Sequence, residues 1–330
     1  MSGALRSSRD EQVREALEGA LVEARGEPVA VADLSRRPFA YETSFAIDEL
    51  DVELVGGERL VLLVKDVAPA GLSAEAAAAK PAQTLDPSRE IAVYRDLLGP
   101  AGLSTPRFHG AAVDPAHARW WLFIERIEGE VLTDVGELEV WCETAAWAAR
   151  LGAAVEPTDQ VLLERDARWH EHWIDTAAAA LREGGPRDRD TAEALARARS
   201  SVVGRLLSLP TAFVHGELYP ANVLVERTGG GPARIAPVDW ELAGTGPYAL
   251  DLAALVSGWG GDERNVICRA FHEDLGPARP SFGELTAAVD LCRLALALQW
   301  IGWSPGWEPP EAHQHDWREE AARLLEAVEV

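Results

Sequence analysis

Two short strand-like stretches stand in the middle of a long run of helical segments, and this feature constrains the fold most. The segments that are predicted to be helical are 137–153, 169–183, 190–208, 248–259, 263–275, 283–301 and 311–328. The strand-like stretches FVHGELYPANVLVE and ARIAPVDWEL lie between the third and fourth of them, joined by residues 228–231. Such a hairpin would bring polar residues beside its strands close together.

The first 127 residues have a different pattern. Residues 10–25 predict an amphipathic helix that ends at Gly26. Strand formers dominate residues 29–65, with Gly56 and Gly57 in a hairpin turn. A further helix over SREIAVYRDLLG, with Ser88 as its N-cap and Gly99–Pro100 as its end, and two strands over 107–113 and 119–127 are predicted next. We therefore expect an α+β protein with an N-terminal sheet lobe (1–127) and a helical C-terminal lobe (130–330).

Composition excludes several classes of function. The 330 residues include 31 Lys and Arg against 54 Asp and Glu, so the net charge is −23. A surface this negative repels nucleic acid and anionic membranes, and we expect neither as a main partner. It favours a cationic ligand, although solubility alone also explains it. We expect a cytoplasmic protein for three reasons. The three cysteines form no CxxC pair, the N-terminus is charged, and Arg293 and Gln299 interrupt the longest apolar run (291–301).

Lysine is the rarest basic residue of the chain, because Lys65 and Lys80 are its only lysines and every other basic residue is arginine. Lys65 ends the apolar strand LVLLVK, where a compact ammonium suits a phosphate group better than a guanidinium does. An edge-strand lysine is the alternative interpretation.

The strand-like stretches carry the polar residues that point to chemistry. Glu217 and Asn222 lie five residues apart on the loop HGELYPAN, and Asp239 follows the next strand. A carboxylate and an amide oxygen that converge on one place suit a hard cation such as Mg²⁺. Glu217 would then face a hydroxyl beside the metal ion.

This arrangement resembles the catalytic and metal loops of the protein-kinase-like fold, and in particular the aminoglycoside phosphotransferase and choline kinase family. That family has HGDxxxxN followed by an IDWE-like segment, where this chain has HGELYPAN and PVDWE. The segment GPYALDLA at 246–253 is similar to the continuation that the family shows. The resemblance implies a two-lobe phosphotransferase that uses ATP or GTP with Mg²⁺ and has its catalytic hairpin at 213–241.

The resemblance also implies roles for single residues on the nucleotide side. Lys65 would hold the α- and β-phosphates, and Glu90 would pair with Lys65. Residues 124–129 would form the hinge, with backbone groups of Glu125 and Ile127 at the adenine edge. Thr43 and Ser44 stand where a phosphate-binding loop would lie, although ordinary turn chemistry explains them equally well.

On the catalytic side, the resemblance implies Asn222 and Asp239 as metal ligands. Glu217 would orient the acceptor hydroxyl and take its proton. His215 would brace the loop, and Asp251 would hold it by accepting backbone N–H bonds.

Two departures from the family pattern keep alternatives open. The stretch between Val31 and Phe45 has no glycine-rich loop, and Glu217 replaces the usual aspartate. The first interpretation is a kinase acting on a hydroxyl of a small molecule, such as an aminoglycoside or another natural product. A peptide Ser/Thr kinase and a pseudokinase that binds a nucleotide or partner without transfer are the others.

The acceptor side has a weaker signal. Tryptophans near the C-terminus, in a region with a predicted loop at 302–310, could form an aromatic wall for a cationic acceptor or simply fill the core; they are Trp259, Trp300, Trp303, Trp307 and Trp317.

Overall fold

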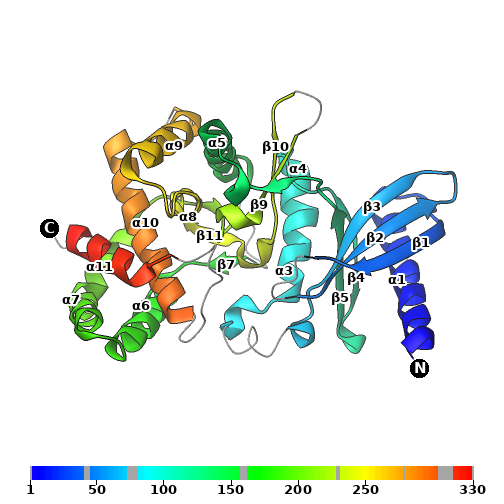
Figure 1. Ribbon diagram of the computed structural model, residues 1–330, viewed down its shortest axis with the longest axis horizontal. Helices are drawn as coiled ribbons and strands as arrows, with labels where there is room; N and C mark the ends of the chain where they lie inside the picture. The colour runs from blue at the N-terminus through cyan, green and yellow to red at the C-terminus, as the bar shows by residue number, and fades with distance from the viewer. Residues whose placement is uncertain are drawn as a thin grey trace. The chain divides into compact units, whose positions relative to one another are not determined.

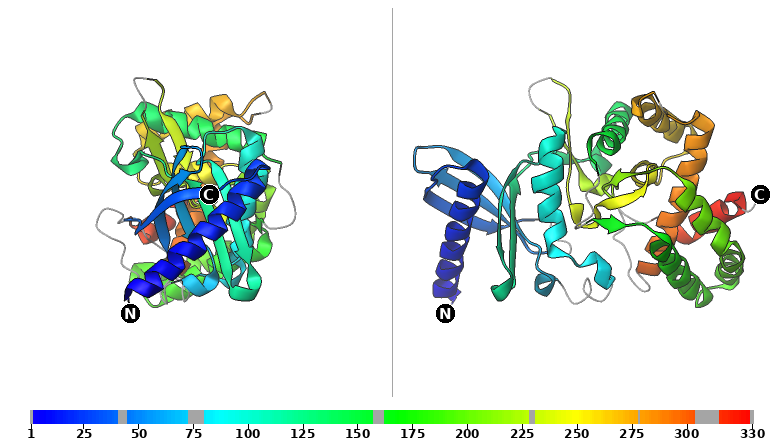
Figure 2. Two further views of the ribbon diagram at one scale, coloured as in Figure 1. Left: turned by 90° about the vertical axis from the view of Figure 1, so that its right-hand side faces the viewer. Right: turned by 180° about the vertical axis from the view of Figure 1, so that it is seen from behind.

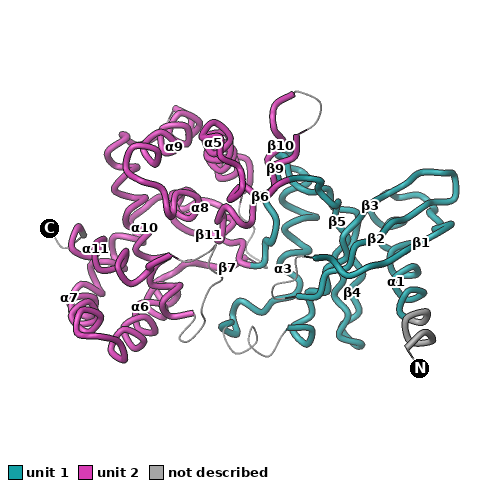
Figure 3. Tube along the Cα trace, viewed as in Figure 1, with its two compact units in different colours: residues 1–129, 236–241 teal, residues 130–235, 242–330 magenta. Residues whose placement is uncertain are grey.

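The computed structural model describes residues 2–40, 45–72, 80–156, 162–227, 231–277, 279–303 and 315–328, with side chains from residue 9 onward. The chain forms two compact units (Figure 3). Unit 1 contains residues 1–129 and 236–241, and unit 2 contains residues 130–235 and 242–330. Residues 236–241, which are predicted to belong to the second lobe, cluster with the first in the structure.

Unit 1 is built on a five-stranded antiparallel sheet (Figure 1). The order across the sheet is β1-β2-β3-β5-β4, which places β3 at its centre. The predicted turn between β2 and β3 is present, with Gly56 and Gly57 at φ values of 120° and 88° that favour glycine. The strands are β1 (Val31–Pro38), β2 (Ile47–Leu54), β3 (Arg59–Asp66), β4 (Phe108–Asp114) and β5 (Arg119–Glu125).

Helix α1 (Ser2–Arg25) crosses one face of this sheet (Figure 2). Its apolar stripe, which includes Val13, Leu17 and Leu21, is buried against sheet residues such as Leu50 and Phe123. The crossing is so close that a Cβ atom on Gly110 of β4 would lie 2.6 Å from the Ala20 carbonyl oxygen. We infer that glycine is required at position 110, where φ is also 137°.

The second helical segment of unit 1 differs at both ends from the prediction. Helix α3 (Pro87–Ala92) is capped by Asp86 and not by Ser88, because the Asp86 carboxylate accepts a hydrogen bond from the Ser88 N–H and Pro87 takes the first helical position. The chain continues as a π-helical turn over Val93–Leu98 and as α4 (Gly99–Ala101), so it does not stop at Gly99–Pro100. The helical segment ends instead at Gly102, whose backbone has a left-handed conformation.

Unit 2 is mainly helical, and every segment predicted to be helical contains a helix. Together with the sheet of unit 1 this confirms the α+β fold class. The predicted segment 248–259 is shorter as α8. Residues 302 and 303 of the predicted loop 302–310 belong to α10, and residues 304–310 lie outside the described ranges. The helices are α5 (Leu138–Ala154), α6 (Ala167–Arg182), α7 (Pro186–Ser208), α8 (Leu250–Leu255), α9 (Gly261–Asp274), α10 (Phe282–Trp303) and α11 (Trp317–Val328).

A core between α6, α7, α10 and α11 holds unit 2 together. It contains leucines from each helix, among them Leu181, Leu206, Leu294 and Leu324. Helix α10 is long and apolar enough to cross a membrane by length and composition, with a mean hydropathy of 1.3 over its best window. Of that window 72% is buried inside the protein, as in the core helix of a soluble protein.

The strand-like stretches of unit 2 fold as short strands in two small sheets. Strand β9 (Val223–Glu226) pairs with β6 (Glu130–Val131) and neighbours β10 (Arg234–Pro237). Strand β8 (Thr211–Val214) pairs with β11 (Gly244–Pro247), which also pairs with β7 (Leu163–Glu164). The first stretch is therefore not one strand but two, with the loop 215–222 between them.

Candidate active site

Lys65 occupies the central strand of the sheet in unit 1. In β3 it pairs with Ile47 on one side and with Leu122 on the other, and its side chain is buried. This excludes the alternative of an edge-strand lysine. A buried ammonium on a central strand needs charged partners, since its desolvation is costly.

Those partners are two carboxylates. Lys65 Nζ lies 2.7 Å from Glu90 Oε2 and 2.5 Å from Asp239 Oδ1. Glu90 comes from the first turn of α3, and Asp239 follows β10. The structure thus brings together three residues that are far apart in the chain and that the sequence analysis assigns to one site.

Burial sets the electrostatics of this cluster. Burial would lower the pKa of Lys65, but the carboxylates of Asp239 and Glu90 together raise that pKa above its ordinary value. Lys65 is therefore firmly protonated. Burial also raises the pKa of Glu90 to about 6, although Lys65 opposes this rise.

The backbone at Asp239 has an unusual conformation. Its φ is 67°, a left-handed value that few residues other than glycine adopt, though Asp and Asn tolerate it best. The next N–H group, from Trp240, donates to Glu90 Oε1 at 3.3 Å. Glu90 therefore holds both Lys65 and the turn that carries Asp239, and backbone strain at this position is typical of functional sites.

In unit 2, Asp251 fixes the loop that carries Glu217. Its carboxylate accepts hydrogen bonds from the backbone N–H groups of His215 (2.7 Å) and Gly216 (2.9 Å). His215 is fully buried, and its Nδ1 lies 3.3 Å from the Glu217 N–H that donates to it. This confirms the predictions that His215 braces the loop and that Asp251 holds it by accepting backbone N–H bonds.

Gly216 is required by the same loop. Its φ is 92°, and a Cβ atom there would collide with the Leu242 carbonyl oxygen and with the Arg165 guanidinium. Arg165 also donates to the Leu242 carbonyl at 2.7 Å. The HG dipeptide thus allows a tightly packed loop to present the half-buried Glu217.

Asn222 is tied to the loop through its amide nitrogen. Nδ2 donates to the Glu217 carbonyl oxygen at 2.9 Å, which leaves the side-chain oxygen as the atom that could serve as a ligand. Magnesium is commonly bound by one or two protein oxygens together with substrate phosphates. The oxygen of Asn222 and the carboxylate of Asp239 fit that donor chemistry.

The structure describes only some of the residues that are predicted to contact the nucleotide base or to form the phosphate-binding loop. In β5, the Glu125 N–H donates to the Arg107 carbonyl at 2.9 Å, so this N–H group already has a partner within unit 1. Ile127 is buried just beyond β5. Thr43 and Ser44 lie outside the described residues.

The C-terminal tryptophans take different parts. Trp300 of α10 donates to the hydroxyl of Tyr219, on the loop of Glu217, at 2.5 Å, and stacks on Trp317 with ring centroids 5.7 Å apart. Trp259 packs edge-on against Trp141, and Trp303 stacks on Trp173. Trp307 lies outside the described residues. At least Trp300 therefore supports the loop.

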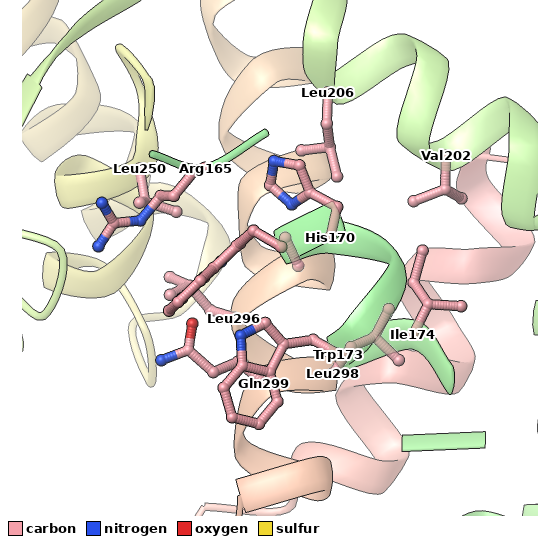
Figure 4. Close-up of a pocket in the computed structure, with 12 residues that line it drawn as sticks. Arg165, His170, Trp173, Ile174, Val202, Leu206, Leu250, Leu296, Leu298 and Gln299 are labelled. Atoms are coloured by element: carbon pink, nitrogen blue, oxygen red, sulfur yellow. The ribbon is translucent and has the colours of Figure 1, made fainter. Parts of the chain in front are cut away.

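A pocket in unit 2, with an empty volume of about 370 Å³, lies between α6, α7 and α10 (Figure 4). Its lining includes His170, Trp173 and Gln299. Within the described part of the chain, His170 Nε2 and Trp173 Nε1 are buried without a hydrogen-bond partner. Burial lowers the pKa of His170 to about 4, with a smaller contribution from Arg165.

The buried His170 predicts acid sensitivity. Above pH 6.5 this histidine is neutral in the folded and unfolded states alike. Between pH 6.5 and 4 only the unfolded state binds the proton, so the free energy of unfolding falls by about 3 kcal/mol. His170→Phe should therefore lose less of its free energy of unfolding than wild type does between pH 7.5 and 4.5, as measured by denaturant unfolding at these two pH values.

His172→Phe, at an exposed position of α6, is the matched control and should keep the full loss. Parallel pH profiles for wild type and His170→Phe would contradict the prediction.

Comparison with known proteins shows the family to which this chain belongs. The model of the phosphotransferase enzyme family (APH) matches residues 51–285. Viomycin phosphotransferase from Streptomyces vinaceus is 34% identical over 88 residues, a stretch that spans 27% of this chain and 31% of that relative. The matched stretch is therefore less than a third of the relative's length.

Solved structures share the fold over nearly the whole chain. Wild-type aminoglycoside 2'-phosphotransferase-IIIa, in its GDP complex, is 13% identical with a TM-score of 0.55, over 93% of this chain and 96% of its own. A choline/ethanolamine kinase family protein from Mesorhizobium loti is 18% identical with a TM-score of 0.56, over 97% and 93%. The fold is that of the kinase-like phosphotransferases. This chain belongs to the phosphotransferase enzyme family.

Proposed function

We propose that the protein transfers the γ-phosphate of ATP or GTP, with Mg²⁺, to a hydroxyl group of a small molecule. The observation that carries the proposal is the cluster in unit 1 in which the buried Lys65 and Glu90 meet the half-buried Asp239. Such a cluster costs desolvation energy, and phosphate binding with a metal ion gives a reason to maintain it. The GDP complex of the similar aminoglycoside phosphotransferase supports nucleotide use.

Each residue then has a part in the transfer. Lys65 binds the phosphate chain as a point charge, and Glu90 holds its ammonium in place. Asn222 and Asp239 supply oxygen ligands for Mg²⁺, which when bound would neutralise charge on the phosphates. Backbone groups of Glu125 and Ile127 bind adenine, and Thr43 and Ser44 bind phosphate.

Glu217 orients the acceptor hydroxyl and takes its proton. The acceptor oxygen forms a bond to the γ-phosphorus while the bond from that phosphorus to the bridging oxygen breaks. The products are a phosphate ester and the nucleoside diphosphate. Glu217 fits this part because its loop is fixed by Asp251 and its side chain is only half-buried.

The acceptor we propose is a small molecule with both a hydroxyl group and a positively charged nitrogen. The net charge of −23 attracts a cationic acceptor. The names of the similar proteins point to aminoglycosides, choline and viomycin, which are therefore the first compounds to test.

Nucleotide binding gives the first measurement. Mg·ATP or Mg·GTP at 100 times its dissociation constant should stabilise the fold by about 2.7 kcal/mol, which is several degrees in a melting curve. We expect this Mg²⁺-dependent rise in wild type and its loss in Asp239→Ala. Absence of any rise at millimolar nucleotide would contradict the proposal.

Transfer is then tested with the acceptor panel by detection of the phosphate ester. A melting shift without transfer to any compound would favour the pseudokinase alternative. Transfer to a Ser- or Thr-containing peptide alone would favour the peptide kinase.

A further inference from the structure

The second lysine of the chain lies in the same buried cluster as the first. The side chains of Lys65 and Lys80 are 8% and 4% exposed. Both ammonium groups approach the ring of Phe45, at 5.4 Å and 5.0 Å from its centroid. A chain that uses arginine at every other basic position therefore has both of its lysines at one site.

Lys80 binds the turn that carries Asp239. Its Nζ contacts both carboxylate oxygens of Glu241, at 2.5 Å and 2.6 Å. Glu241 is thus held through its side chain by Lys80 and through its carbonyl oxygen, at 2.8 Å, by the guanidinium of Arg89.

Every residue of the turn 239–241 is bound by unit 1 in a similar way. Lys65 contacts the side chain of Asp239, and Glu90 accepts the N–H of Trp240. Lys80 completes the set at Glu241. Residues of β3 or of the segment 80–90 therefore contact the turn at each of its three positions.

Charge explains why the pair with Lys80 matters. Without Lys80, Lys65 would be the only lysine among the carboxylates of Glu90, Asp239 and Glu241. Glu241 would then be a largely buried carboxylate without its cation, and it would compete with Asp239 for Lys65. A displaced Lys65 would bind phosphate less well.

The choice of lysine fits this part. A single ammonium contacts both Glu241 oxygens and lies 5.0 Å from the centroid of the Phe45 ring. The planar guanidinium of arginine carries its donors in a wide fork and needs more room.

We propose that Lys80 is a positioning residue of the phosphate site, which neutralises Glu241 so that Lys65 and the turn of Asp239 keep the geometry that binds nucleotide. This role rests on the proposed function. In the sequence, Lys80 stands out as one of only two lysines, but no pattern around it predicts a role.

The test compares Lys80→Met with the double variant Lys80→Met/Glu241→Gln, which removes both charges and keeps the shapes. The readouts are the dissociation constant for ATP without Mg²⁺, by calorimetry, and the KM and kcat for transfer. We expect Lys80→Met to weaken ATP binding and to raise KM at least tenfold with a smaller change in kcat. The double variant should bind ATP within threefold of wild type.

Two results would overturn the proposal. Unchanged ATP binding in Lys80→Met would show that the pair has no part in the site. A double variant as weak as Lys80→Met would show that Lys80 contacts the nucleotide itself. If Lys80→Met does not fold, the double variant decides alone, with a tenfold or greater loss counting against the proposal.

A matched control separates this role from general stability. Arg25→Met/Glu58→Gln removes an exposed ion pair from the same unit and should leave ATP binding unchanged. A purely structural part for Lys80 would lower the melting temperature and the active fraction but leave KM unchanged. Wild type that binds no nucleotide would refute the proposed function, and the role of Lys80 with it.

Discussion

Asp239→Asn is expected to lower kcat/KM for phosphoryl transfer by about 10³-fold or more, equal to a loss of about 4 kcal/mol of transition-state stabilisation. Asparagine tolerates the left-handed φ of 67° at this position, so the turn should keep its shape. The loss then comes from the carboxylate, which pairs with Lys65 and is the proposed ligand for the metal ion. Initial rates with the acceptor found in the panel measure it.

The matched control is Asp33→Asn, on an exposed position of β1 in the same unit, which should transfer phosphate as wild type does. Circular dichroism should show both variants folded. If Asp239→Asn kept more than a tenth of the wild-type kcat/KM, Asp239 would have no place in the catalytic machinery.

Glu217→Gln is expected to lower kcat by about 10²- to 10⁴-fold, the usual contribution of a positioned general base. Nucleotide binding should stay within a few fold of wild type, because the loop is held by Asp251 and His215 through contacts that do not use this carboxylate. The measurement is kcat at saturating nucleotide beside the dissociation constant for nucleotide.

Glu217→Asp separates a tuned glutamate from a degenerate one. The shorter side chain withdraws the carboxylate by about 1.5 Å, and a misplacement of about 1 Å costs on the order of 10²-fold in rate. We expect a loss of that size. A large gain in rate would instead mean that Glu217 marks a weakened site, and an unchanged kcat in Glu217→Gln would remove it from the mechanism.

Much of the fold and of the candidate site could be predicted because the signals in the sequence are local. A few neighbouring residues suffice to predict the strand that carries Lys65, the loop HGELYPAN and the helix that carries Glu90. The resemblance to a known family then supplied the pairing of Lys65 with Glu90, which the structure shows at 2.7 Å.

What remained hidden depends on contacts between distant segments. Strands β6 and β7 have two residues each, too few for a periodic pattern to predict them. The Asp86 cap was missed because Asp86 and Ser88 are both good capping residues, and the position of Pro87 decides between them. Lys80 could be flagged only by its rarity, since its partner Glu241 lies 161 positions away.

Unit 1 is formed from two separate segments of the chain, and this has a consequence for synthesis on the ribosome. Helix α1 and the five strands are complete once residue 129 has been made, but residues 236–241 follow only after much of unit 2. Until then Lys80 lacks Glu241 and Lys65 lacks Asp239. Because a buried cation without a partner is costly, the nascent small unit must leave Lys80 in contact with water, whereas Lys65 can already pair with Glu90. The last step of its folding therefore waits for the later part of the chain to be translated.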